Sequence, residues 1–209
     1  MIATRIPFAG LVVGCLLHGA ALAQSDESYV ESATGFVFPA QIAMFHRVAV
    51  TEFPDKRMGV VIRYEGRGRA EAFVYDLGFA DIPTGIDSEA AKKAFAQSEA
   101  GIERLLTSKP ASDGKKFLES TPVVETECRQ AKLLAALYTW TFTGSDGRGG
   151  PMATFILVTG VKNKIMKLLY TAPAPEPAST QRDLKELVIG FLEANPKERG
   201  SFFVEKKAP

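Results

Sequence analysis

The chain has 209 residues and a nearly balanced charge, with 25 basic and 24 acidic side chains. This length suits one domain of ordinary size with short extensions. Nucleic-acid binding normally requires basic residues collected on one face, and no basic run in this chain is longer than a pair, so we expect no nucleic-acid partner.

The N-terminal segment has the three parts of a secretory signal peptide. Arg5 provides the positive region, residues 8–17 form the apolar region, and Ala21-Leu22-Ala23 is a small-x-small cleavage site. We therefore predict a signal peptide over residues 1–23, cleavage after Ala23, and a periplasmic or secreted mature protein. The apolar region is shorter than the ~20 residues of a membrane-spanning helix, so no transmembrane segment is expected after signal removal.

A second interpretation of the same segment is lipoprotein processing. Val12-Val13-Gly14-Cys15 loosely resembles a lipobox, in which Cys15 would be acylated and would anchor the protein. We favour cleavage after Ala23, because the apolar Leu16-Leu17 would otherwise follow the lipidated residue where a polar tether is expected.

The mature chain would keep one cysteine, Cys128, and one histidine, His46. No disulfide can form within it, and too few sulfur or imidazole ligands remain for an ordinary zinc site. Asp76, Asp81 and Asp87 lack the alternating spacing of an EF-hand loop and are typical of turns and helix caps. We expect no metal and no cofactor.

The first half of the mature chain predicts strands. Residues 24–34 are polar and are expected to form a flexible leader, and residues 35–38 form a short strand that ends at Pro39. Apolar alternation predicts a strand over residues 46–51. A hairpin is expected from residues 60–65 and 70–75, which are joined by Gly66-Arg67-Gly68.

A helix follows over residues 88–106, with Asp87 as the expected N-cap. Residues 108–122 contain several turn-forming residues and are expected to be a surface connection. Four more strands are predicted, with a tight turn at Lys162-Asn163 before the last of them: residues 123–129, 133–143, 152–160 and 164–171.

The last predicted element is a helix that begins with a capping box formed by Thr180 and Asp183 and ends at Asn195-Pro196. Residues 196–209 are expected to form a tail. Strands and helices do not alternate regularly, which indicates one α+β domain over residues 35–195. We predict a meandering antiparallel sheet covered by two helices on one face.

This order of elements resembles the Mog1/PsbP-type fold, which includes DcrB-like periplasmic proteins of bacteria. The resemblance extends over residues 35–194, from the strand that ends in Phe38-Pro39 to the closing helix that reads Leu187-Val188-Ile189-Gly190-Phe191. It implies a non-catalytic accessory or envelope-associated module, and it assigns a role to no individual residue.

Enzymatic chemistry has two candidate sites in this sequence. Cys128 and His46 are the one available cysteine nucleophile and base, and Glu125 and Glu127 would share a strand face beside the cysteine. A buried Cys128 and a solvated pair of glutamates explain these residues more simply. We expect a non-catalytic binding or envelope accessory module; the alternative is an enzyme that uses Cys128/His46 or the Glu125/Glu127 pair.

An aromatic row is expected on one face of the strand over residues 133–143, formed by Tyr138, Trp140 and Phe142. We interpret the row as core, because a one-sided sheet requires an apolar face. A small apolar ligand, which with an envelope protein is the partner that we consider, would first be sought between this row and the helix over residues 88–106. No catalytic or ligand-binding residue is assigned.

Overall fold

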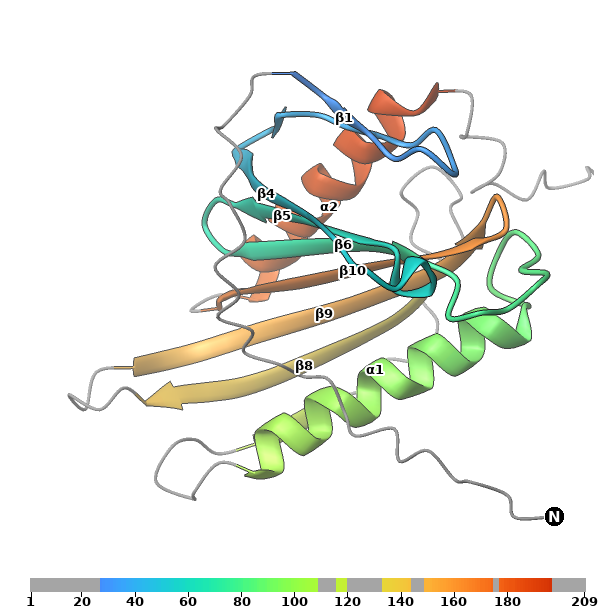
Figure 1. Ribbon diagram of the computed structural model, residues 1–209. Helices are drawn as coiled ribbons and strands as arrows, with labels where there is room; N and C mark the ends of the chain where they lie inside the picture. Colours follow the sequence, from blue (N-terminus) through green and yellow to red (C-terminus); the bar gives the residue numbers. More distant parts are fainter. Residues whose placement is uncertain (1–26, 109–115, 120–132, 144–148, 175–176, 197–209) are drawn as a thin grey trace, which may run out of the picture.

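The computed structural model describes residues 27–108, 116–119, 133–143, 149–174 and 177–196. Eight strands of this part of the chain form one antiparallel sheet in the order β3-β4-β5-β6-β10-β9-β8-β7, and β1 pairs separately with β2 (Figure 1). The predicted α+β class and the antiparallel sheet are confirmed. The bounds are β1 Tyr29–Val30, β2 Val37–Phe38, β3 Gln41–Ile42, β4 Phe45–Glu52, the 3-10 helix η1 Lys56–Met58, β5 Val60–Glu65, β6 Arg69–Tyr75, α1 Glu89–Ser108, β7 Lys116–Glu119, β8 Leu134–Thr143, β9 Gly149–Val161, β10 Lys164–Pro173 and α2 Pro177–Ala194.

The sheet consists of two meanders that meet in its middle. Strands β3 to β6 follow one another in space as they do in the chain, and so do β7 to β10. The last strand, β10, then lies beside β6, with Ile165 opposite Tyr75 and Thr171 opposite Arg69. The predicted tight turn between β9 and β10 is present, and Lys162 and Asn163 both have positive φ angles, 46° and 62°.

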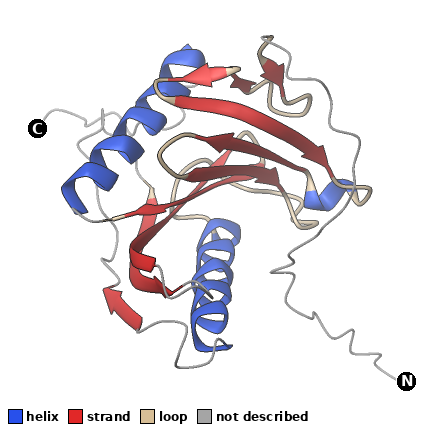
Figure 2. Cartoon of the chain, turned by 90° about the vertical axis from the view of Figure 1, so that its left-hand side faces the viewer, coloured by secondary structure: helices blue, strands red, loops and turns tan. Residues whose placement is uncertain are grey.

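The two helices cover opposite faces of the sheet, so the prediction of both helices on one face is wrong (Figure 1; Figure 2). Leu133 and Ala135 are buried in one cluster with Leu187 of α2, whereas Leu134 and Ala136 are buried in a second cluster with residues of α1. Adjacent side chains of a strand point to opposite faces. The unbroken apolar run over residues 133–136 is therefore buried by cover on both sides.

Both helices begin one or more residues away from their predicted starts. Ser88 caps α1, since its hydroxyl accepts a hydrogen bond of 3.0 Å from the amide of Ala91, and Asp87 does not. Helix α2 begins at Pro177, a residue that suits a first turn because it lacks an amide hydrogen, so the predicted capping box at Thr180 is not the helix start. The helix ends at Ala194, as the Asn195-Pro196 stop predicts.

Two segments that were expected to lack regular structure contribute strands. Residues 29–30 form β1, with Glu31 and Thr34 buried after it, so the predicted leader over residues 24–34 ends earlier than expected. Strand β7 lies within the predicted connection over residues 108–122 and pairs with β8. The predicted strand over residues 123–129 lies outside the described residues. Within the described ranges, no helix combines the length and apolarity needed to cross a membrane.

Candidate functional site

An apolar cavity of about 50 Å³ lies between the sheet and α2. Its walls come from three parts of the chain: the β1–β2 hairpin, helix α2, and the sheet face that α2 covers. The lining side chains are Phe36 and Phe38 of the hairpin, Val188, Phe191 and Leu192 of α2, and Ala72, Leu133, Leu157, Thr159, Met166 and Leu168 of the sheet side.

The strand register builds the floor of the cavity. Leu168 of β10 lies between Ala72 of β6 and Leu157 of β9, and Met166 lies beside Thr159. Ala72 carries the smallest side chain of this row, which lowers the floor relative to its leucine neighbours. The flexible thioether of Met166 can adjust to the shape of a bound group. The floor therefore combines a rigid backbone with one adaptable side chain.

Aromatic side chains form the wall opposite the floor. The Phe191 ring meets the Phe38 ring edge-on at a centroid distance of 5.6 Å, and it meets the Tyr64 ring edge-on at 5.5 Å. The Tyr64 hydroxyl donates a hydrogen bond of 2.8 Å to the carbonyl of Pro39, and burial raises the pKa of Tyr64. This phenol is neutral at physiological pH and holds the chain that follows the hairpin.

The lining chemistry favours apolar ligands. Among the residues that the structure describes, no ionisable side chain lines the cavity, and Thr159 is the one polar lining residue. The Thr159 hydroxyl contacts the carbonyl of Gly160 at 3.4 Å. A charged group placed here would lose its hydration without gaining a partner, which is strongly unfavourable. An alkyl or small aryl group would gain the free energy of apolar burial.

The residues of the enzyme hypothesis are not brought together by the described structure. His46 lies on β4, exposed to solvent, opposite Gln41 and Glu65, and it does not line the cavity. Cys128 and the Glu125/Glu127 pair lie outside the described residues, as do Cys15 and Ala23. The enzyme hypothesis and the predicted processing of the N-terminus stay predictions.

The aromatic row of β8 lies on the other face of the sheet. Tyr138 is 1% exposed and belongs to the cluster beneath α1, which confirms its interpretation as core. Its hydroxyl donates to Glu99 at 3.3 Å, and Trp140 donates to the hydroxyl of Thr154 at 3.2 Å. The side chain of Phe142 lies outside the described residues. The cavity therefore lies on the opposite side of the sheet from the place that the sequence suggested. The signals that could have located it are the two phenylalanines, Phe36 and Phe38, and the small side chain of Ala72.

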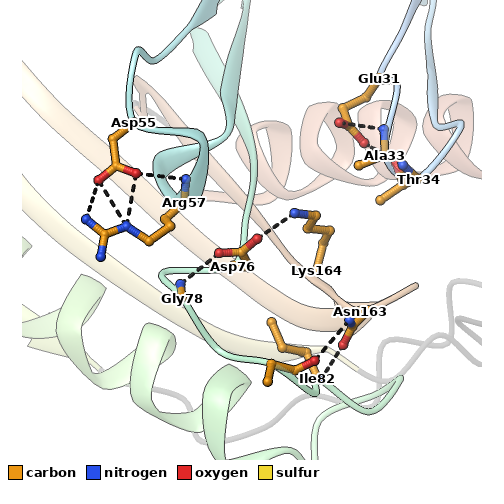
Figure 3. A network of polar contacts seen from close by, with 11 residues as sticks. Glu31, Ala33, Thr34, Asp55, Arg57, Asp76, Gly78, Ile82, Asn163 and Lys164 are labelled. Atoms are coloured by element: carbon orange, nitrogen blue, oxygen red, sulfur yellow. Dashed lines mark hydrogen bonds and ion pairs between the residues drawn. The ribbon is translucent and has the colours of Figure 1, made fainter.

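The acidic side chains of Asp55 and Asp76 brace turns. Within the described ranges, no group of three or more His, Cys, Asp or Glu side chains is placed to hold a metal ion. The Asp76 carboxylate accepts hydrogen bonds from Lys164 at 2.6 Å and from the Gly78 amide at 2.7 Å, and Asp55 pairs with Arg57 nearby (Figure 3). Burial alone would raise the pKa of Asp76, but the bonds from Lys164 and Gly78 outweigh it and lower that pKa.

Lys167 is an unusual cation on the sheet face opposite the cavity. Its ammonium nitrogen lies 4.1 Å from the centroid of the Phe73 ring and 5.8 Å from that of Tyr75, both within cation–π range. Burial lowers the pKa of Lys167 to about 8, although the carboxylate of Glu71 opposes the shift. The folded protein therefore holds the Lys167 proton less tightly than the unfolded chain does.

Replacing this lysine by an apolar residue is expected to stabilise the protein at neutral pH. Below pH 8 the folded state carries the cost of a desolvated ammonium, and that cost disappears as pH rises from about 8 towards the ordinary value of 10.5. Urea unfolding at pH 7 should show Lys167→Met more stable than the parent by about 1 kcal/mol, because cation–π attraction offsets part of the desolvation. The difference between the two proteins should shrink at pH 10.

Lys93→Met provides the control for that measurement. The Lys93 ammonium lies 5.5 Å from the Phe79 ring at an exposed position on α1, and its replacement should change stability by less than about 0.5 kcal/mol. If Lys167→Met destabilises the protein at pH 7, attraction to the two rings exceeds the cost of burying the charge.

No family model and no curated protein matches the chain. A crystal structure of a protein from Bacteroides thetaiotaomicron VPI-5482 has partial similarity, with 11% sequence identity and a TM-score of 0.36. The match covers 78% of this chain and 47% of that chain, so this chain spans less than half the length of that structure. Similarity at this level transfers no function, and the Mog1/PsbP-type resemblance stays a prediction.

Proposed function

We propose that this domain is an exported, non-catalytic binding module that holds the end of an unbranched alkyl chain in the cavity beneath α2. The observation that carries the proposal is the composition of the cavity wall, whose described residues offer apolar side chains from three parts of the chain and no ionisable group. The predicted signal peptide supports a place outside the cytoplasm, where lipids and their degradation products supply such chains.

The size of the cavity decides in favour of a linear ligand. Sites for drug-sized ligands usually have volumes of roughly 300–1,000 Å³. The cavity here has about 50 Å³, which is too small for a fused ring system. A polymethylene chain has the narrowest cross-section among apolar organic groups, so its last few carbons fit where a ring does not. The polar end of the ligand would remain in solvent.

A chain-length series tests this proposal. Sodium salts from butanoate to dodecanoate keep one head group and change one methylene at a time. We expect affinity, measured by isothermal titration calorimetry, to rise about fourfold per added methylene, from about 0.8 kcal/mol each, and then to level off once the cavity is filled. Binding should have a negative heat-capacity change, the signature of apolar burial.

Two controls locate the binding site and define its shape. Cyclohexanecarboxylate has the same number of carbons as heptanoate and should bind far more weakly. Val188→Phe places a larger side chain in the cavity and should abolish heptanoate binding, whereas Leu184→Phe, on the same helix but outside the cavity lining, should keep it. Equal affinity for all chain lengths, or unchanged binding by Val188→Phe, would exclude this cavity as the site.

A further inference from the structure

Two of the three walls of the cavity are firmly anchored. The floor belongs to the hydrogen-bonded strands β6, β9 and β10. Helix α2 buries Leu187 completely and approaches the sheet closely at Gly190, where an added Cβ would lie 2.1 Å from Cγ2 of Ile42. Neither wall can move far without breaking the core. The third wall, which carries Phe36 and Phe38, is the β1–β2 hairpin.

The hairpin is a small unit that is separate from the main sheet. Its strands have two residues each and pair only with one another among the described strands. Its turn is braced from within, because the Glu31 carboxylate accepts hydrogen bonds from the amides of Ala33 and Thr34 and from the Thr34 hydroxyl (Figure 3). Such a short ribbon depends on its contacts with the rest of the domain for its position.

Between the two ends of the hairpin, Phe36 and Phe38 are buried in the same core cluster as Leu187. Side-chain hydrogen bonds to the rest of the domain form two groups, one at each end. At the base of the hairpin, Arg47 of β4 donates hydrogen bonds to the carbonyls of Glu27 and Phe38. Tyr64 of β5 donates to the carbonyl of Pro39. The Glu52 carboxylate of β4 accepts a hydrogen bond from Tyr29 of the hairpin. Nearer its tip, Asn195 and Lys162 hold the backbone of Val37 and Thr34.

Asn195 makes the most extensive of these contacts. Its carboxamide accepts a hydrogen bond of 2.8 Å from the Val37 amide and donates one of 2.9 Å to the Val37 carbonyl, and it also donates to the carbonyl of Phe191 at 2.8 Å. Asn195 is 4% exposed and follows directly on α2. The Lys162 ammonium adds a bond of 2.6 Å to the carbonyl of Thr34. One amide side chain thus ties the end of α2 to the strand between Phe36 and Phe38.

We infer that the β1–β2 hairpin is the gate through which an alkyl chain enters the cavity, hinged at its base by Arg47 and Tyr64 and latched by Asn195. This inference rests on the proposed function. The latch bonds join side chains to backbone, so they can open without disturbing any ladder of the main sheet. Outward rotation of the hairpin would carry Phe38 away from Phe191 and would widen the opening through which the polar end of the ligand reaches solvent. Because it also exposes the buried rings of Phe36 and Phe38, the open state is a minor one.

The inference predicts faster ligand exchange when the latch is removed. The probe is octanoate that carries a 13C label at its terminal methyl, the carbon that the proposed function places in the cavity. In NMR line-shape titrations of the mature chain, Asn195→Ala should raise both the association and the dissociation rate constants about thirtyfold, the change expected for the loss of its two hydrogen bonds to Val37 at ordinary strength. The dissociation constant should stay within about threefold, because the open and closed gates surround the same cavity.

Asn163→Gly is the matched control. The Asn163 amide bridges another loop in the same way, accepting from the Ile82 amide at 2.7 Å and donating to the Ala80 carbonyl at 3.2 Å, and it lies outside the cavity lining (Figure 3). Glycine is chosen because Asn163 has a φ of 62°, which alanine would adopt with strain. This variant should leave both rate constants of the probe unchanged.

Hydrogen exchange of the parent protein tests the gate without any variant. The amide of Val37, whose hydrogen bond to Asn195 is broken when the gate opens, should exchange through a local opening, faster than the amides of β9 and β10. Exchange of this amide only through global unfolding, or unchanged probe kinetics in Asn195→Ala, would overturn the gate while leaving the proposed function in place. Absence of probe binding by the parent would instead overturn the proposed function, and the gate with it.

Discussion

Gly59→Ala is expected to destabilise the protein by about 4 kcal/mol or more, a large part of the 5–15 kcal/mol that typical domains possess. Gly59 follows η1 with φ 64° and ψ −129°, a conformation that favours glycine. A Cβ at this position would lie 1.8 Å from the carbonyl oxygen of Val74 and 2.9 Å from the Cα of Tyr75. These are backbone atoms of β6, a central strand, so the clash cannot be relieved by a side-chain rotation.

Gly35→Ala separates backbone strain from steric clash. Gly35 also has a positive φ of 71°, but no atom lies within 4 Å of the position of its Cβ. The free energy of unfolding of this variant should fall by about 1–2 kcal/mol, the cost of the backbone conformation alone. Urea unfolding followed by circular dichroism measures both variants. If the two variants lose similar amounts of stability, β6 shifts to accommodate the added methyl group, and the close approach of Gly59 to β6 contributes little.

Phe191→Ala is expected to cost about 3 kcal/mol, the lower end of the range for such truncations, because the ring is only half-buried. The change removes both edge-on contacts, to Phe38 and to Tyr64. It also enlarges the cavity by most of a ring. The parent should bind cyclohexanecarboxylate only weakly, and we therefore expect calorimetry to show tighter binding of this acid by the variant.

Phe95→Ala is the comparison for that variant. Phe95 is a half-buried residue of α1 that packs against the second cluster, on the other face of the sheet. Its truncation should reduce stability to a similar extent and leave the ring-bearing acid unbound. A Phe191→Ala protein that melts like the parent would show that the apolar stripe of α2 is a surface for a partner and not part of the core.

The local elements of this fold were readable from the sequence, because each depends on nearby residues. The hairpin of β5 and β6, the turn at Lys162-Asn163 and the stop of α2 at Asn195-Pro196 follow from alternation, turn chemistry and proline. The relative placement of the helices was not readable. It depends on which face of the strand over residues 133–136 each helix covers. Because this run is apolar on both faces, its sequence does not indicate which helix packs on which face.

The candidate site was hidden for a related reason. The cavity combines Phe36 and Phe38, near the start of the described residues, with Phe191 near their end, and no spacing rule connects such distant residues. The phenylalanines look like ordinary core positions, and Ala72 is informative only once its neighbours across the strands are known. The latch was equally unreadable, because Asn195 has the sequence context of a simple helix stop.

The junction between β6 and β10 has a consequence for how the chain reaches its native state. Each meander can form from hairpins between strands that are close in sequence, and such local pairs form fast. The pairing of Tyr75 with Ile165 must wait until the chain has passed through α1, β7, β8 and β9. Closing so long a loop is entropically costly, which makes this pair the expected slow step of folding. Until it closes, the inner edges of both meanders remain open to pairing with other chains.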